Sequence, residues 1–168
     1  MTDARWLDVE RDIASGLYHI ERAIALYESR ELQGSEDNSY YNRMAFLHSM
    51  QSGYTSLENA LVRVLTVLEE ERPDGQDWHE TLLRRLGNYF PGSRPAMLSP
   101  QLHSNLDELR RFRHVAAHTY DMFDAAQAKP AVESGKYVNE NVLQEFREFR
   151  DTIDPPYDCP DINPTSTL

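Results

Sequence analysis

The residues best suited to chemistry lie together in one short stretch, residues 110–120, which reads Arg-Arg-Phe-Arg-His-Val-Ala-Ala-His-Thr-Tyr. It holds three arginines, two histidines and a tyrosine in a chain that is otherwise strongly acidic. Within it, Arg113, His118 and Tyr120 form an Arg-x4-His-x-Tyr pattern. Arginine binds phosphate, histidine transfers protons near neutral pH, and tyrosine offers a hydroxyl that can be modified. The pattern suggests phosphodiester chemistry on RNA.

Cleavage of RNA without a metal ion needs three groups. A base takes the proton of the ribose 2′-OH, a cation stabilises the phosphorane, and an acid protonates the leaving 5′ oxygen. His118 suits the role of base or acid, and Arg113 suits bidentate phosphate binding. His114 or Arg110 could assist. Each residue also has a simpler interpretation, because a histidine on an arginine-rich helix is often only solvated and Tyr120 can be a half-buried packing residue.

The helix that carries this motif is expected to open at Ser99-Pro100, with serine as N-cap, and to run to about Ala126. At 100° per residue, one face of it is apolar and should face the core, namely Leu102, Leu106, Leu109, Phe112, Ala116, Thr119 and Phe123. Arg113 and His118 then point about 140° apart. They could meet at one phosphate if the guanidinium reaches round, if the helix kinks, or if a second copy of the helix supplies the partner group.

Apolar residues at steps of three and four predict two long helices before the motif, at about 3–32 and 40–71. A shorter helix should follow, capped by Asp77 with Glu80 as its capping-box partner. Lys129-Pro130 and Ser134-Gly135 are expected to interrupt the chain before a last helix at 138–153.

The predicted fold is therefore all-α, a bundle of four main helices plus a short one. Residues 1–153 form the expected domain, and residues 154–168 form a proline-rich tail that we expect to be flexible.

The charge is unevenly spread. The chain carries a net charge of −11, yet residues 81–120 hold a local net of +4, which leaves −15 on the remainder. This basic stripe consists of six arginines, at positions 84, 85, 94, 110, 111 and 113. A basic stripe on an acidic body can bind a small RNA segment while repelling long duplexes. Solvated helix faces with ordinary salt bridges are the simpler alternative.

Several other classes of protein are not expected. No segment is apolar over the length of a membrane span, and residues 1–6 do not resemble a signal peptide. Cys159 cannot form an internal disulfide, which fits a cytoplasmic protein. His114 and His118 have the spacing of a helical metal pair but few acidic neighbours, so we expect no metal and no cofactor. His79, in the first turn of a helix, is assigned to capping or packing.

The sequence resembles the HEPN superfamily and, within it, the HepT-like ribonuclease toxins, over roughly residues 5–125. The resemblance rests on the all-α pattern, the Arg113-x4-His118 core, the polar His114 directly after the arginine, and Tyr120 two residues after the histidine. The segment from Asp77-Trp78-His79 to Leu83 and the Leu98-Ser99 pair are also similar to that group.

This resemblance implies a toxin of a type II-like toxin–antitoxin pair, a homodimeric, metal-independent endoribonuclease in which two motifs line one cleft. Arg113 and His118 are then the catalytic pair and His114 the polar helper. The implied partners are RNA, either tRNA or mRNA, and an MNT-type nucleotidyltransferase antitoxin that adds AMP to Tyr120. Glu58-Asn59 resembles a polar pair of such proteins and could support the site, with a buried hydrogen bond to the motif helix as the simpler role.

Two alternatives to the toxin remain open. The first is a non-catalytic HEPN subunit that presents nucleotide or substrate to a nucleotidyltransferase, and the second is a helical bundle of unrelated role. The strongly acidic body could reflect binding to a basic antitoxin, or a binding module that has lost activity.

Overall fold

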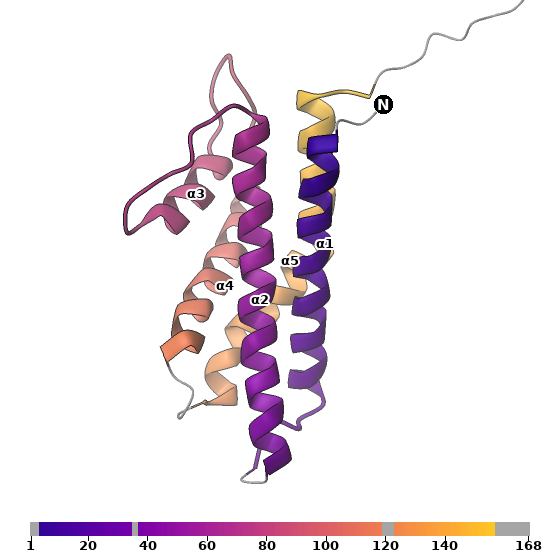
Figure 1. Cartoon of the computed structure of the whole chain (residues 1–168), viewed down its shortest axis with the longest axis vertical. Helices are drawn as coiled ribbons and strands as arrows, with labels where there is room; N and C mark the ends of the chain where they lie inside the picture. Colours follow the sequence, from indigo (N-terminus) through magenta and orange to yellow (C-terminus); the bar gives the residue numbers. More distant parts are fainter. Residues whose placement is uncertain (1–3, 35–36, 119–122, 157–168) are drawn as a thin grey trace, which may run out of the picture.

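The computed structural model describes residues 4–34, 37–118 and 123–156, apart from the side chain of His118. Its described part contains five helices and no strand, which confirms the predicted bundle of four long helices and one short one (Figure 1). They are α1 (Ala4–Glu28), α2 (Asp37–Val67), α3 (Trp78–Gly87), α4 (Pro100–His118) and α5 (Ala125–Ile153). None of these helices is both long and apolar enough to cross a membrane.

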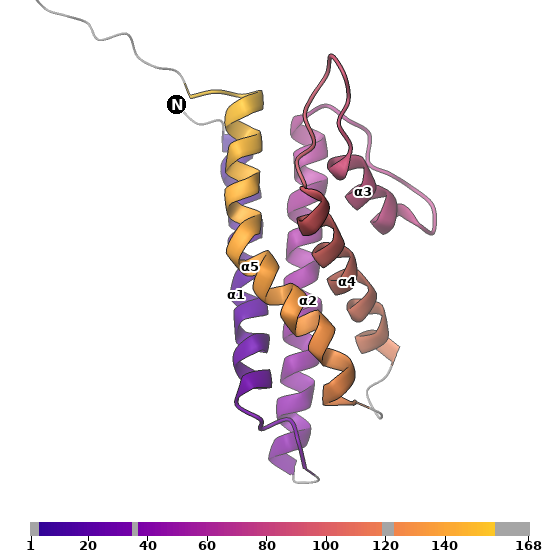
Figure 2. The same cartoon turned by 180° about the vertical axis from the view of Figure 1, so that it is seen from behind.

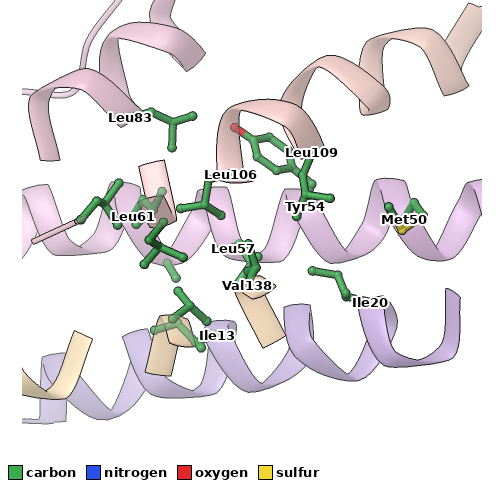
Figure 3. Packing of buried hydrophobic residues seen from close by; sticks show 14 of the residues in the cluster. Ile13, Ile20, Met50, Tyr54, Leu57, Leu61, Leu83, Leu106, Leu109 and Val138 are labelled. Carbon is green, nitrogen blue, oxygen red and sulfur yellow. The ribbon is translucent and has the colours of Figure 1, made fainter. Parts of the chain in front are cut away.

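The four long helices form a ring in which α1 packs on α2, α2 on α4, α4 on α5, and α5 back on α1. The C-terminal part of α5 runs along α1, and its N-terminal part leans toward α4 (Figure 2). The short helix α3 lies outside this ring and packs on α2 and α4. All five helices contribute side chains to one core (Figure 3).

Two glycines let α1 and α2 approach closely. A Cβ on Gly16 would lie 2.9 Å from the carbonyl oxygen of Gly53, and a Cβ on Gly53 would lie 2.7 Å from Ile20 Cγ1. Both distances are too short for real carbon contacts, so only glycine fits at this crossing. The position of α2 along α1 is therefore set by backbone contact as well as by side-chain packing.

The N-terminus of α4 is fixed by a capping serine, as predicted. The amide of Leu102 donates to Ser99 Oγ at 3.1 Å. Glu145 of α5 in turn accepts from the amide and the hydroxyl of Ser99, at 2.8 and 2.7 Å. The predicted core face of α4 is confirmed for Leu102, Leu106, Leu109, Phe112 and Ala116, which are buried, and Phe123 packs against the core. Thr119 lies outside the described residues.

The expected break between the motif helix and the last helix was misplaced. Asp124 is already the N-cap of α5, with its carboxylate accepting from the amide of Ala126 at 2.8 Å, and α5 continues through Pro130. Gly135 also does not interrupt it, since this residue lies against Ile20, where a Cβ would come within 3.1 Å. Gly135, which suggested a loop, instead lies at a close contact between α5 and α1.

The capping box predicted for the short helix is also absent. Asp77 occupies the N-cap position, but its side chain makes no capping hydrogen bond. Its backbone carbonyl instead accepts from the amide of Thr81 at 3.0 Å. The helix is positioned by its buried leucines and by contacts to α2 and α4. At the other end of the chain, Trp6 Nε1 donates to Asp154 at 3.1 Å, and the tail beyond residue 156 lies outside the described residues.

Arg94 holds the connection between α3 and α4. Its side chain is 2% exposed and pairs with Glu70, just beyond the end of α2, with Nε 2.5 Å from Oε1. Its Nη2 also donates to the carbonyl of Arg85 at 3.0 Å, and its guanidinium lies 4.8 Å from the centre of the Phe90 ring. One member of the predicted basic stripe is therefore buried and structural.

We expect Arg94→Lys to lower the free energy of unfolding by about 1–3 kcal/mol, because one ammonium cannot replace the several hydrogen bonds of the buried guanidinium. Urea denaturation of the purified protein measures this change. Arg84→Lys is the matched control, since Arg84 is exposed on α3 and donates to the hydroxyl of Thr81. Equal stability of the two variants would contradict the structural role of Arg94.

Candidate functional site

The candidate site is built on one buried carboxylate, that of Glu58 on α2. This residue is 4% exposed and lies where α3 and α4 both pack on α2. Its Oε2 accepts a hydrogen bond from Arg113 Nη1 of α4 at 3.0 Å. Its Oε1 accepts from Nδ1 of His79 on α3. An ionised carboxylate only accepts hydrogen bonds, so His79 must carry its proton on Nδ1.

Helical spacing explains how these groups meet. On α2, Gln51, Tyr54 and Glu58 follow at steps of three and four and so share one side of the helix. On α4, Arg110 and Arg113 are three residues apart and face that side of α2. A carboxylate buried to this extent is stable only with partners that replace its hydration. The neighbouring helices supply both partners.

A pocket of about 390 Å³ lies beside Arg110 and Arg113. Its size falls within the range typical of small-molecule and cofactor sites. Residues of α2, α3, α4 and the connection before α3 line it, namely Gln51, Gln76, His79, Arg110, Arg113, His114 and Ala117. Two arginines, two histidines and two amide side chains give the pocket a lining suited to an anion.

Arg113 lies at the wall of the pocket with its side chain 29% exposed. Glu58 engages one of the five N–H donors of its guanidinium. The guanidinium carbon also lies 5.8 Å from the centre of the Tyr54 ring. The carboxylate and the ring hold the charged end of Arg113 in a defined place, and its remaining donors suit a phosphate.

Tyr54 lies beneath this arrangement and is 1% exposed. Figure 3 shows its hydroxyl oxygen directed away from α1, toward the side of α2 that carries α3 and α4. Burial raises the pKa of Tyr54 well above its usual value, and the negative charge of Glu58 raises it further. The hydroxyl therefore stays protonated beside the carboxylate of Glu58.

Arg110 is held by a second carboxylate. Its Nε donates to Asp107 at 2.7 Å, and Arg111 also reaches Asp107, at 2.5 Å. Burial alone would lower the pKa of Arg110, but the hydrogen bond and charge of Asp107 outweigh it, and the pKa is raised. Arg94, Arg110, Arg111 and Arg113 thus each pair with a carboxylate. Glu58 and Glu70 lie outside residues 81–120, so their charges offset part of the local net of +4.

The structure brings some of the predicted site residues together and leaves others apart. Arg110, Arg113 and His114 share the pocket, and His114 is exposed. His118 is the last residue of α4, but its side chain lies outside the described part, as does all of Tyr120. Asn59 is exposed, so it does not join Glu58 at the buried carboxylate.

His79 and Tyr54 are the neighbours of Glu58 that sequence reasoning missed. The assignment of His79 to capping or packing overlooked its bond to Glu58, although its ring does pack on Trp78 with centroids 3.8 Å apart. The sequence of α2 did contain a signal for this site. Gln51, Tyr54 and Glu58 place polar atoms at helical spacing beside an apolar stripe. Within the described part of the chain, no three His, Cys, Asp or Glu side chains are grouped so that they could hold a metal ion.

Comparison with known proteins identifies the family. The family model described as HepT-like protein matches residues 45–153, from the first third of α2 to the end of α5. The match covers more than half of the chain, so the protein belongs to the HepT-like family. It extends past residue 125, where the resemblance was expected to end, and includes Glu58, His79 and Arg113. Searches of curated proteins and of solved structures find no match.

We expect Glu58→Gln to lower the free energy of unfolding by about 1–3 kcal/mol at neutral pH. The amide offers one acceptor where the two donors of Arg113 and His79 need two, and its NH2 group faces one of them. Urea denaturation measures the loss. The exposed Glu80 provides a matched control in Glu80→Gln. A Glu58→Gln variant as stable as this control would contradict the shared-carboxylate arrangement.

Proposed function

We propose that this HepT-like protein is the toxin of a toxin–antitoxin pair and a metal-independent endoribonuclease. The observation that carries the proposal is the placement of Arg113. Its guanidinium is anchored on a buried carboxylate at the wall of a pocket lined by cationic and amide side chains. A pre-positioned guanidinium stabilises the charge that develops on a transferred phosphoryl group.

In this proposal the ribose 2′ oxygen attacks the adjacent phosphorus while a base removes its proton. The bond from phosphorus to the 5′ oxygen then breaks, and an acid protonates that oxygen. The products are a 2′,3′-cyclic phosphate and a 5′-hydroxyl end. Arg113 binds the phosphate and stabilises the phosphorane, and His118, five residues further along, takes one of the two proton-transfer roles. His114 and Arg110 add positive charge and hydrogen bonds at the same pocket.

The proposed protein works as a homodimer. Positions 113 and 118 diverge on one helix, so Arg113 of one copy and His118 of the other can act on the same phosphate. Its proposed partners are RNA and a nucleotidyltransferase antitoxin of the MNT type. The antitoxin adds AMP to Tyr120, which follows the last residue of α4, His118, by two positions. An added phosphate there would compete with RNA for the cations of the pocket.

A second candidate function is a non-catalytic subunit that binds a nucleotide for a nucleotidyltransferase. The pairing of Arg113 and Arg110 with carboxylates favours it, because paired arginines attract RNA less strongly than unpaired ones. A pocket of about 390 Å³ also suits a single nucleotide. The ribonuclease assay below separates the two functions.

We expect the purified wild-type protein to cleave RNA in the presence of EDTA and to leave 2′,3′-cyclic phosphate ends. Arg113→Ala and His118→Ala should each lower the rate at least about 100-fold, as expected when a phosphate-binding or proton-transfer group is lost. The measurement uses total tRNA and mRNA, with product ends identified by mass spectrometry.

His48→Ala serves as the control, since His48 is an exposed histidine on α2 that does not line the pocket. It should retain wild-type activity. Wild-type protein that leaves every RNA intact while carrying no nucleotide on Tyr120 would favour the nucleotide-binding subunit. Full activity in both site variants would place the chemistry elsewhere.

We further expect incubation with an MNT-type nucleotidyltransferase and ATP to add AMP to the wild-type protein and to abolish its ribonuclease activity. Tyr120→Phe should take up no AMP, because it lacks the acceptor hydroxyl. Tyr18→Phe, at an exposed tyrosine of α1, should be modified like the wild type. Intact-protein and peptide mass spectrometry measure the adduct, and AMP on another residue would refute the assignment of Tyr120.

A further inference from the structure

We propose that His79 is the general base of the ribonuclease reaction and takes the proton from the ribose 2′-OH. This inference rests on the proposed function and adds a catalytic residue outside the Arg-x4-His-x-Tyr motif. It also gives Glu58 a second role, that of orienting the base.

The first argument is the tautomer of His79. Its Nδ1 hydrogen is held by the carboxylate of Glu58, so in the neutral ring Nε2 carries the lone pair. A carboxylate on one nitrogen fixes the tautomer and stabilises the imidazolium that forms when the other nitrogen accepts a proton. The same logic operates in the Ser-His-Asp triad, where the acid orients the histidine base.

The second argument is the location of the ring. The side chain of His79 is 27% exposed and lines the pocket that Arg113 also lines. Since Nδ1 is engaged by Glu58, Nε2 is the ring nitrogen that a ligand in the pocket can reach. Trp78 packs against the ring, with centroids 3.8 Å apart, and Arg72 lies 4.2 Å from the centre of the Trp78 ring. The imidazole is thus held on one face as well as at one nitrogen.

The third argument is the spacing of the charges. Arg113 and His79 bind the two oxygens of the same carboxylate and line the same pocket, so the two side chains lie close together. A phosphate held by Arg113 would then bring its ribose close to His79. The placement of His79 beside Arg113 gives it the base role. The acid role, at the 5′ oxygen, is then left to His118, the other histidine of the proposed reaction.

In the resulting step the 2′ oxygen bonds to phosphorus as its proton moves to His79 Nε2. The bond from phosphorus to the 5′ oxygen breaks, and that oxygen takes a proton from His118. The protein then holds one proton more on His79 and one fewer on His118, and exchange with water restores both histidines. No oxidant, reductant or further reactant is needed.

The first test compares two substitutions at position 79. His79→Asn retains a side-chain N–H in reach of Glu58 but has no group that accepts a proton, whereas His79→Ala lacks both. We expect both to lower kcat about 100-fold or more, the effect of losing a general base. KM should change little in His79→Asn, because Arg113 stays anchored on Glu58. Near-wild-type kcat in His79→Asn would overturn the proposal, since the hydrogen bond alone would then suffice.

The second test separates base from acid. In an RNA whose scissile 5′ oxygen is replaced by sulfur, the leaving group needs no proton, so loss of the acid no longer slows the reaction. We expect His118→Ala to regain activity on this substrate and His79→Asn to remain slow. Recovery of His79→Asn together with continued inactivity of His118→Ala would reverse the two assignments and overturn the proposal.

The third test does not depend on RNA cleavage. Nitrogen-15 NMR of the histidine side chains reports which ring nitrogen carries the proton, and comparison with His79→Asn assigns the signal. We expect the Nδ1–H tautomer in the wild type and its loss in Glu58→Gln. An Nε2–H tautomer would overturn the proposal. His48→Asn is the control for all three tests, because it makes the same exchange at an exposed histidine outside the pocket.

The outcomes also separate this inference from the proposed function. Wild-type protein that carries no nucleotide on Tyr120 and still lacks ribonuclease activity overturns both. An active wild type with an equally active His79→Asn variant overturns only the role of His79. Circular dichroism and urea denaturation of each variant show whether a lost rate reflects lost folding.

Discussion

The buried carboxylate of Glu58 is the interaction on which the candidate site depends. It lies on α2 and binds α3 through His79 and α4 through Arg113. A charge at 4% exposure is unfavourable unless its partners replace the water that it has lost. The two partners therefore cannot move independently of the carboxylate, and removal of either leaves an unpaired polar group. The same contact that holds three helices together also sets the position of the cations at the pocket.

The rest of the bundle keeps that contact in register. Gly16 and Gly53 bring the backbones of α1 and α2 together at one crossing, which fixes the rotation and position of α2. Arg94 ties the connection before α4 to Glu70, just beyond the end of α2, and Glu145 of α5 holds the capping serine of α4. These contacts lie outside the pocket, yet they set where α4 begins and hence where Arg113 lies four turns later. A shift of one residue in α4 would turn Arg113 by about 100° from Glu58.

Much of the fold could be predicted from periodicity, because burial of an apolar stripe is a property of the local sequence. The number of helices, the core face of α4 and its serine cap were all predicted correctly. The start of α5 was not, because Gly135 and Pro130 look like a break in the sequence, whereas α5 runs through both and Gly135 packs against Ile20. Likewise the spacing of Asp77 and Glu80 allowed a capping box, but tertiary packing, not the cap, positions α3.

In the candidate site, too, the residues close together in sequence could be predicted and those brought together by folding could not. Arg113, Arg110 and His114 could be picked out because they share one short segment of the sequence, and the structure brings them to one pocket. His79 could not be joined to Arg113 from the sequence, because 34 positions separate them and only the folded chain brings both to Glu58. The roles of Arg113, His118 and Tyr120 in chemistry remain predictions.

The charge of the molecule constrains what kind of RNA the proposed ribonuclease can use. With a net charge of −11, the protein repels nucleic acid at a distance, and each arginine of the motif helix already has a carboxylate partner. Attraction must therefore come from close contact within the pocket and not from long-range steering. A regular duplex would lay many phosphates against the acidic body, whereas a single-stranded loop can insert one or two nucleotides. The pairing of cations and carboxylates thus favours single-stranded RNA loops and ends over RNA duplexes. A pocket of about 390 Å³ also has room for only a small part of an RNA strand.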